Sequence, residues 1–114
     1  MDAQRCILTR RSVRQFADRP VSRELLEKVV SLASYAPSWK NTQISRYIAI
    51  EDPATRETIA SEYCLPGANN PTIIRACPLL VAQTFVKARS GYERDGSFTT
   101  DREAGWQYYD CGIA

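Results

Sequence analysis

The chain carries two polar stretches from which the rest of it is best interpreted, Arg10-Arg11-Ser12-Val13-Arg14-Gln15-Phe16 and Ala36-Pro37-Ser38-Trp39-Lys40-Asn41-Thr42-Gln43. The first stretch is rich in guanidinium groups, which bind a phosphate through paired, charge-assisted hydrogen bonds. Arg10 and Arg14 share a face if the stretch is a helical turn, and in a bend they could still converge on one anion. The same residues also fit a solvated basic segment after a helix, where cations favour the C-terminal dipole.

The second stretch follows the clearest predicted helix and precedes an apolar run, so a loop there can be held rigidly. Asn41 and Gln43 each offer donor and acceptor groups, which suits a planar ligand with a mixed polar edge. Trp39 is suited to covering such a ring. Two alternatives stay open on these residues, because Trp39 also fits ordinary packing and Asn41 also fits local turn capping.

Composition excludes several classes of protein. With 114 residues, 44% of them hydrophobic, the chain is expected to form a single domain over residues 1–114. A net charge of +2 gives no strong bias toward nucleic acid or an anionic membrane, so we expect neither as a partner. Residues 1–10 lack the apolar core of a signal peptide, and no run approaches the roughly 20 apolar residues that span a bilayer. We therefore predict a cytoplasmic location.

The chain has no histidine, which excludes Ser-His-Asp and Cys-His nucleophile pairs and imidazole bases in this segment. Its cysteines are Cys6, Cys64, Cys77 and Cys111, which form no C-x-x-C pair, so we predict reduced, partly buried thiols and no metal site. If the chain is an enzyme, a bound cofactor is expected to carry the chemistry.

Helices and strands alternate in the predicted order of elements. We expect a short helix over 3–9 that turns Cys6 and Ile7 toward a core, and an amphipathic helix from the N-cap Ser22 to about residue 36. The apolar run at 47–50 predicts a strand covered on both faces. Asp52 and Pro53 predict the start of a helix that reaches about residue 63.

The second half of the chain predicts fewer elements. Turn-forming residues fill 65–71, and a second buried strand is expected over 79–86. Residues 87–102 predict a surface loop, with a substrate lid as the alternative. A further helix starts near residue 103 and places Trp106, Tyr109 and Ile113 on one side. This order favours an α/β or α+β fold, in which two strands alone would make a thin sheet.

The order and spacing of these segments resemble the nitroreductase family of FMN enzymes. The stretch 10–16 is followed by Pro20-Val21, the amphipathic helix and the pattern Ala-Pro-Ser-x-x-Asn-x-Gln, and residues 76–78 and 109–114 resemble later landmarks of that family. The resemblance implies an α+β, nitroreductase-like fold with a mixed sheet flanked by helices. Because family members continue through a long central helix and further strands, it also implies that the C-terminal part of the fold is missing here.

The resemblance further implies a flavin-dependent oxidoreductase that passes hydride from NADH or NADPH through FMN to a nitroaromatic, quinone or similar small acceptor. It implies a homodimer with FMN at the subunit interface, and it leaves the chemistry to the flavin rather than to a catalytic side chain. Arg10, Arg11 and Ser12 would hold the phosphate and ribityl end, and Arg14 would lie near the flavin N1 and O2 edge. The remaining flavin-binding residues would be Pro37, Ser38, Trp39, Asn41, Gln43 and Asn70.

The sequence departs from the family pattern in two places. Ile44-Ser45 stands where many relatives have Pro-Trp, and Ile73 stands where a lysine can follow the matching asparagine, so that Arg14 would carry the flavin-edge charge alone. Two other functions stay open on the sequence. One is a non-catalytic flavin-binding or dimerisation module, and the other is an anion- or nucleotide-binding domain without redox work.

Overall fold

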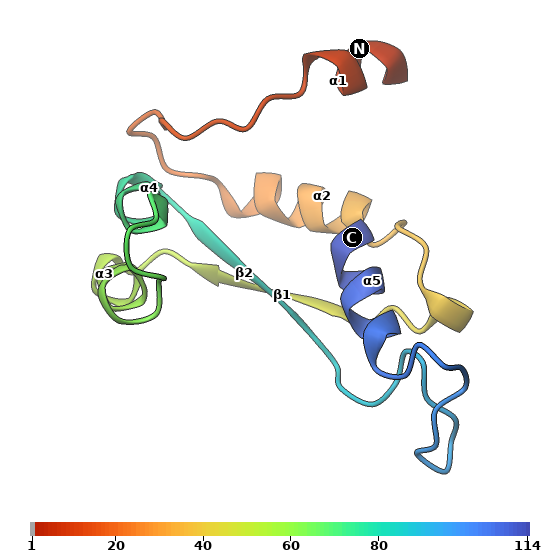
Figure 1. The fold of residues 1–114 in the computed structure, drawn as a ribbon. Coiled ribbons are helices and arrows are strands. Elements are labelled where there is room, and N and C mark those ends of the chain that lie inside the picture. Colours follow the sequence, from red (N-terminus) through yellow and green to blue (C-terminus); the bar gives the residue numbers. More distant parts are fainter. Residues whose placement is uncertain (1) are drawn as a thin grey trace. The chain divides into compact units, whose positions relative to one another are not determined.

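The computed structural model describes residues 2–114, whose elements are shown in Figure 1. The chain divides into two compact units, one made of residues up to Arg19 with Glu51–Pro78, and one made of Pro20–Ile50 with Leu79–Ala114. We call these the helical unit and the sheet unit. The single domain expected over residues 1–114 stays a prediction.

The sheet unit contains two strands, β1 (Ser45–Ile50) and β2 (Leu80–Phe85), which pair antiparallel from Ser45↔Phe85 to Ile50↔Leu80. Both strands were expected, but the predictions that the first is covered on both faces and that the second is buried are wrong. Burial alternates along β1, and Ile48 is 52% exposed. One packed and one open face is the usual arrangement of an antiparallel pair, which a short apolar run does not reveal.

Helix α2 (Arg23–Ala33) begins where the sequence predicts it. The hydroxyl of its N-cap Ser22 accepts the N–H of Leu25 at 3.2 Å, and Glu24 lies in the first turn. The helix ends before the expected residue 36. Its last turn tightens, because the N–H of Ala36 bonds the carbonyl of Ala33 at 3.0 Å, three residues back, as the chain approaches Pro37.

Helix α5 (Gly105–Ile113) contacts β2 and buries polar side chains. Gln107 and Asp110 are its buried residues, whereas Tyr109 is 63% exposed and Ile113 is 42% exposed. The side of α5 that carries the large apolar residues is therefore largely open to solvent. Residues 87–102 form a loop, as predicted, which an isolated bridge between Tyr92 and Phe98 tightens.

The helical unit contains α1 (Ala3–Thr9), α3 (Pro53–Glu62) and α4 (Asn70–Ala76). Asp52 caps α3 as predicted, accepting the N–H of Thr55 at 2.8 Å. Helices α3 and α4 pack together, and Arg75 of α4 forms a two-bond ion pair with Glu57 of α3. Hydrogen bonding from Arg75 lowers the pKa of the Glu57 carboxyl.

Two predictions for the helical unit are wrong. Turns were expected over 65–71, but α4 already begins at Asn70, because Pro71 fits the first turn of a helix as well as it fits a turn. Cys6 and Ile7 were expected to face a core, but Cys6 is exposed and Ile7 is 75% exposed, since no described apolar surface covers α1.

All four cysteines are free thiols, as expected, and Cys77 is buried. Within residues 2–114 no helix combines the length and the apolar character that crossing a bilayer requires.

Candidate functional site

The predicted ligand-facing loop lies in the sheet unit, between α2 and β1, and is strained. It contains a single 3₁₀ turn, η1 (Trp39–Asn41), and the backbone φ angles of Lys40, Asn41 and Gln43 are 46°, 53° and 47°. Residues other than glycine rarely adopt this left-handed conformation, which costs on the order of 1–3 kcal/mol each and persists only where the surroundings enforce it. Such strain is concentrated at functional sites, so we call residues 37–43 the site loop.

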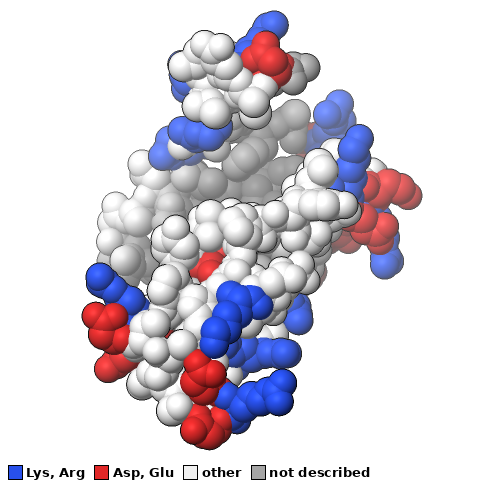
Figure 2. Space-filling model, turned by 90° about the vertical axis from the view of Figure 1, so that its right-hand side faces the viewer, with Lys and Arg blue, Asp and Glu red and all other residues white. Residues whose placement is uncertain are grey.

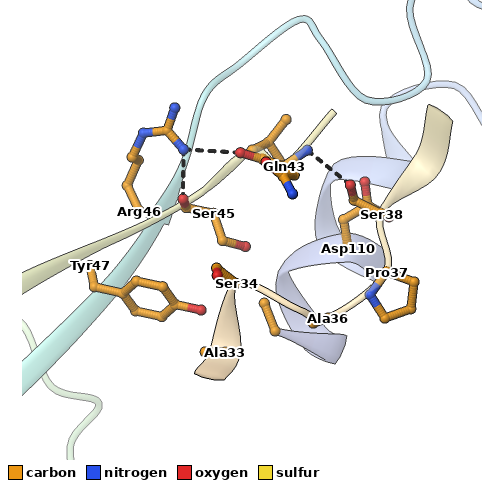
Figure 3. A pocket seen from close by; sticks show the side chains of 12 residues that line it. Ala33, Ser34, Ala36, Pro37, Ser38, Gln43, Ser45, Arg46, Tyr47 and Asp110 are labelled. Carbon is orange, nitrogen blue, oxygen red and sulfur yellow. Dashed lines mark hydrogen bonds between the residues drawn. The ribbon is translucent and has the colours of Figure 1, made fainter. Parts of the chain in front are cut away.

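Hydrogen bonds within the site loop enforce part of this conformation (Figure 3). The Ser38 hydroxyl accepts the backbone N–H of Gln43 at 2.8 Å, and the Thr42 hydroxyl donates to the carbonyl of Trp39 at 2.9 Å. The Arg46 guanidinium of β1 donates to the carbonyl of Gln43 at 3.0 Å. Ser38, expected to bind a ligand, therefore also holds the backbone of the loop.

A buried carboxylate from α5 holds the start of the site loop. Asp110, only 3% exposed, accepts the backbone N–H of Trp39 on both of its oxygens, each at 3.1 Å. Its Oδ2 also accepts the hydroxyl of Ser90 at 2.6 Å, and Ser90 is completely buried. Figure 3 shows the Asp110 side chain reaching from α5 toward Ser38. The carboxylate thus joins the site loop, α5 and the loop 87–102.

A cavity of about 150 Å³ lies beside the site loop, between the end of α2, the start of β1 and α5. Asp110, Gln43 and Tyr47 are among the residues that line it. The Tyr47 hydroxyl points toward the end of α2 in Figure 3 and is buried without a hydrogen-bond partner among the described residues. The cavity therefore has a mixed polar and apolar lining.

The site loop also borders a larger groove of about 370 Å³, which Trp39, Lys40 and Arg89 help to line. Lys40 lies 4.3 Å from the centre of the Trp39 ring and forms an ion pair with Glu93 at 3.1 Å. The Trp39 ring is half-buried, and its centre lies 6.4 Å from that of Trp106. Both the covering role and the packing role considered for Trp39 are compatible with this position.

The side chains of Asn41 and Gln43 are exposed on this rigid backbone. Asparagine tolerates the left-handed conformation better than most residues, so Asn41 serves the turn through its backbone while its amide stays accessible. The site loop therefore carries two exposed amide groups, each of which can donate and accept hydrogen bonds.

The arginine stretch lies in the helical unit. Residues 10–16 are non-helical, so Arg10 and Arg14 do not share a helical face, and both side chains are exposed. The Arg11 guanidinium donates to the carbonyls of Leu8 and Arg10 at 2.9 and 2.8 Å, which is the helix-end role left open for this stretch. Ser12 is exposed, as is Asn70, the first residue of α4. The ligand roles expected for these residues stay predictions.

On the face drawn in Figure 2 most charged groups lie toward the edges, where blue and red groups adjoin, and much of the surface between them is white. This agrees with the net charge of +2. An anion would therefore be recognised by a few specific side chains rather than by a broad positive field.

One departure from the family pattern has a structural explanation. Ile44, which replaces the expected proline, is 1% exposed and is the largest completely buried apolar side chain of the sheet unit. Its carbonyl accepts the N–H of Val86 at 3.0 Å, which extends the strand pairing toward the site loop. Ile44 thus anchors the loop from the core.

Sequence reasoning missed Asp110 and Ser90 as site residues. Asp110 stood among the landmarks of the resemblance, but no role followed from its neighbours. A signal was present, since an aspartate three residues after Gln107, within an otherwise apolar helix, suggests a buried polar face.

Comparison with known proteins extends this description. The model of the nitroreductase family matches residues 7–70, which include the arginine stretch, the site loop and Asn70. A protein of Thermus thermophilus named NADH dehydrogenase is 37% identical over 59 residues, which are 52% of this chain and 29% of that protein.

Solved structures match the fold over nearly the whole chain. A nitroreductase family protein from Clostridium novyi NT has a TM-score of 0.77 at 21% identity, covering 99% of this chain and 59% of that one. An FMN-dependent nitroreductase from Clostridium difficile R20291 has a TM-score of 0.65 at 23% identity, covering 92% of this chain and 51% of that one. The chain spans less than two thirds of each of these relatives. Its nitroreductase-like fold is confirmed, and by the match over residues 7–70 the chain belongs to the nitroreductase family.

Proposed function

We propose that this chain forms part of an FMN-dependent oxidoreductase, which passes hydride from NADH or NADPH to a nitroaromatic, quinone or similar small acceptor. The observation that carries the proposal is the site loop, whose left-handed backbone holds the amides of Asn41 and Gln43 exposed. Family membership and the FMN named for the C. difficile relative support the cofactor.

The residues present suit FMN in their chemistry. The site loop supplies amide donors and acceptors for the polar edge of the isoalloxazine ring, and the Trp39 ring, half-buried beside Lys40, offers a flat apolar face. Arg10 and Arg14 expose guanidinium groups suited to a phosphate and to a negative ring edge, and Asn70 adds an exposed amide. Bound FMN supplies the hydride chemistry, so the protein needs no histidine for it.

The protein's own contribution is binding and orientation. Pro37 and Ser38 lead the chain into the strained turn, and the Ser38 hydroxyl is engaged with Gln43, so its ligand contact is secondary to its hold on the loop. The Arg11 guanidinium donates to the carbonyl of Leu8 in α1 and to that of Arg10, the C-cap, which leaves the Arg10 side chain and Ser12 as the freer phosphate donors of this stretch. We further propose a homodimer with the flavin at the subunit interface.

A visible absorption spectrum of the purified protein, before and after anaerobic addition of NADH or NADPH, tests the proposal. We expect flavin absorption bands that bleach on reduction and recover when a nitroaromatic or quinone is added. A colourless protein that cannot be reconstituted with FMN would overturn the cofactor assignment. Flavin bands that neither nicotinamide bleaches would favour a non-catalytic flavin-binding module instead.

A further inference from the structure

We propose that Asp110 is a positioning residue for flavin binding, which acts by fixing the site loop in its left-handed conformation. The inference rests on the proposed function for the identity of the ligand, but its structural part concerns the loop alone. Both carboxylate oxygens of Asp110 accept hydrogen bonds inside the protein, so we assign the side chain to holding the loop rather than to contacting the ligand.

The burial of Asp110 requires these hydrogen bonds. A carboxylate that is 3% exposed has lost nearly all of its hydration, and donors within the protein must replace the lost water. Hydrogen bonds that involve an ionised acceptor are about twice as strong as neutral ones. The two contacts to the N–H of Trp39 therefore fix the first residue of η1, the point at which the backbone enters the left-handed conformation.

The bonds of Asp110 reach beyond the local hydrogen bonds of the site loop. Those from Ser38 and Thr42 join residues within the loop and can be kept while the loop moves as a whole. Asp110 lies 71 residues away in the sequence and connects Trp39 to α5. It therefore fixes where the loop lies as well as how it is folded, and an amide ligand contact depends on both.

The same face of α5 holds the loop 87–102. Gln107, 5% exposed, accepts the N–H of Ala88 on Oε1 at 2.7 Å, and Asp110 accepts the hydroxyl of Ser90. Ala88 also has a left-handed φ of 56°. Two buried polar side chains, one helical turn apart, thus hold two strained loops that both line the groove of about 370 Å³ beside Trp39.

The substitution Asp110→Asn tests the proposal, because it keeps the side-chain volume and replaces one acceptor oxygen by an NH₂ donor. If the amide oxygen takes the place of Oδ2 and keeps the Ser90 hydroxyl, the NH₂ group takes the place of Oδ1 and sets a donor against the Trp39 N–H, which Oδ1 accepts at 3.1 Å. Ser90→Ala is the milder variant, which removes one hydrogen bond and leaves both contacts to Trp39. Gln83→Leu is the matched control: Gln83 donates to the carbonyl of Cys111 at 2.7 Å, so its loss also loosens α5, without a bond to the site loop.

Flavin affinity gives the first readout, by fluorescence titration of the apoprotein with FMN. We expect the FMN dissociation constant to rise about tenfold or more in Asp110→Asn and to change little in Gln83→Leu. In Ser90→Ala we expect a rise that is several-fold smaller than that in Asp110→Asn. An Asp110→Asn protein that binds FMN as the wild type does would overturn the inference. If that variant fails to fold, a dissociation constant of Ser90→Ala equal to that of Gln83→Leu would overturn it as well.

Hydrogen exchange of the apoprotein separates this inference from the proposed function. We expect peptides covering residues 38–43 to exchange faster in Asp110→Asn than in Gln83→Leu, while peptides of β1 and β2 exchange equally in both. This result is independent of any ligand. If the wild type binds no FMN, the cofactor assignment fails, and exchange at residues 38–43 still decides whether Asp110 fixes the loop.

Discussion

Side-chain oxygens of Asp2, Ser22 and Asp52 cap helices α1, α2 and α3, and the effect of each cap can be measured separately. Ser22 caps α2 through its hydroxyl, which bonds the N–H of Leu25 at 3.2 Å. We expect Ser22→Ala to lower the free energy of unfolding by about 1 kcal/mol in urea titrations. Ser31→Ala, within the same exposed helix, is the control and should be neutral or slightly stabilising because alanine favours helix. Equal effects of the two substitutions would contradict the capping role.

Asp52 makes the stability of α3 depend on pH. Hydrogen bonds from the Thr55 hydroxyl, and then from its N–H, lower the pKa of the Asp52 carboxyl in the folded protein. A lowered pKa means that the stabilisation is fully present above the unfolded value of about 3.9 and is lost as the pH falls through the lower folded value.

We therefore expect the free energy of unfolding to decline between pH 5 and 2, and to decline less in Asp52→Asn, which caps the helix without titrating. Urea titrations of both proteins across this range measure the difference. Parallel pH curves for the two proteins would show that Asp52 contributes nothing to the pH dependence.

Residue-scale features were predictable where they depend on near neighbours. Ser22 and Asp52 were identified as caps because the bonded N–H lies three residues along the chain. The hydrogen-bond partners of Asp110, Trp39 and Ser90, lie 71 and 20 residues away in the sequence, and no pattern of neighbouring residues predicts such contacts. For the same reason, the local role of Arg11 at the end of α1 was anticipated as an alternative, while the ligand roles of the arginines depend on contacts outside the segment.

At the scale of the elements, the loop 87–102 depends on close packing against α5. Gly91 has a φ of 83°, and a Cβ there would lie 2.6 Å from the carbonyl oxygen of Glu103 and 3.0 Å from the Trp106 ring. Gly96 has a similar φ of 86°, but a Cβ there would meet nothing within 4 Å. The two glycines therefore separate backbone strain from steric clash.

We expect Gly96→Ala to cost about 1–2 kcal/mol of unfolding free energy, which is the penalty of a left-handed alanine. Gly91→Ala should cost a further 1–3 kcal/mol, roughly, because Glu103 and Trp106 must move. Urea unfolding followed by tryptophan fluorescence measures both. If the two variants are equally stable, the loop does not pack on α5 as described.

The predicted element boundaries are correct where a cap or a proline marks them. They are wrong where a residue is compatible with both a helix and a turn. Pro53 marks the start of α3, but Pro71, predicted to be a turn residue, is the second residue of α4. The helix near residue 103 was also expected, yet the buried positions of α5 are the polar Gln107 and Asp110. Periodicity identifies a helix but does not say which of its faces the fold covers.

For the whole molecule, the family and the fold were predicted from the order of several short motifs, and both are confirmed. The open outer face of β1 was not predictable, because burial depends on which other segments cover a strand.

The assembly also stays a prediction. We expect light scattering after size exclusion to give twice the mass of one chain and one FMN per chain, and a monomer that still holds FMN would contradict the interface site.

The connection between the strands has a consequence for folding speed. Ile50, the last residue of β1, is paired with Leu80, the first residue of β2. The segment between them, which carries α3 and α4, therefore begins and ends at adjacent positions of the sheet. The ends of this long connection must come together before the strands can pair, and the chain entropy lost in that step is compensated only once strand contacts form. Nucleation of the sheet is therefore slow. If α3 and α4 form first, they shorten the effective length of the connection, and the helical hairpin would then set the rate at which the sheet assembles.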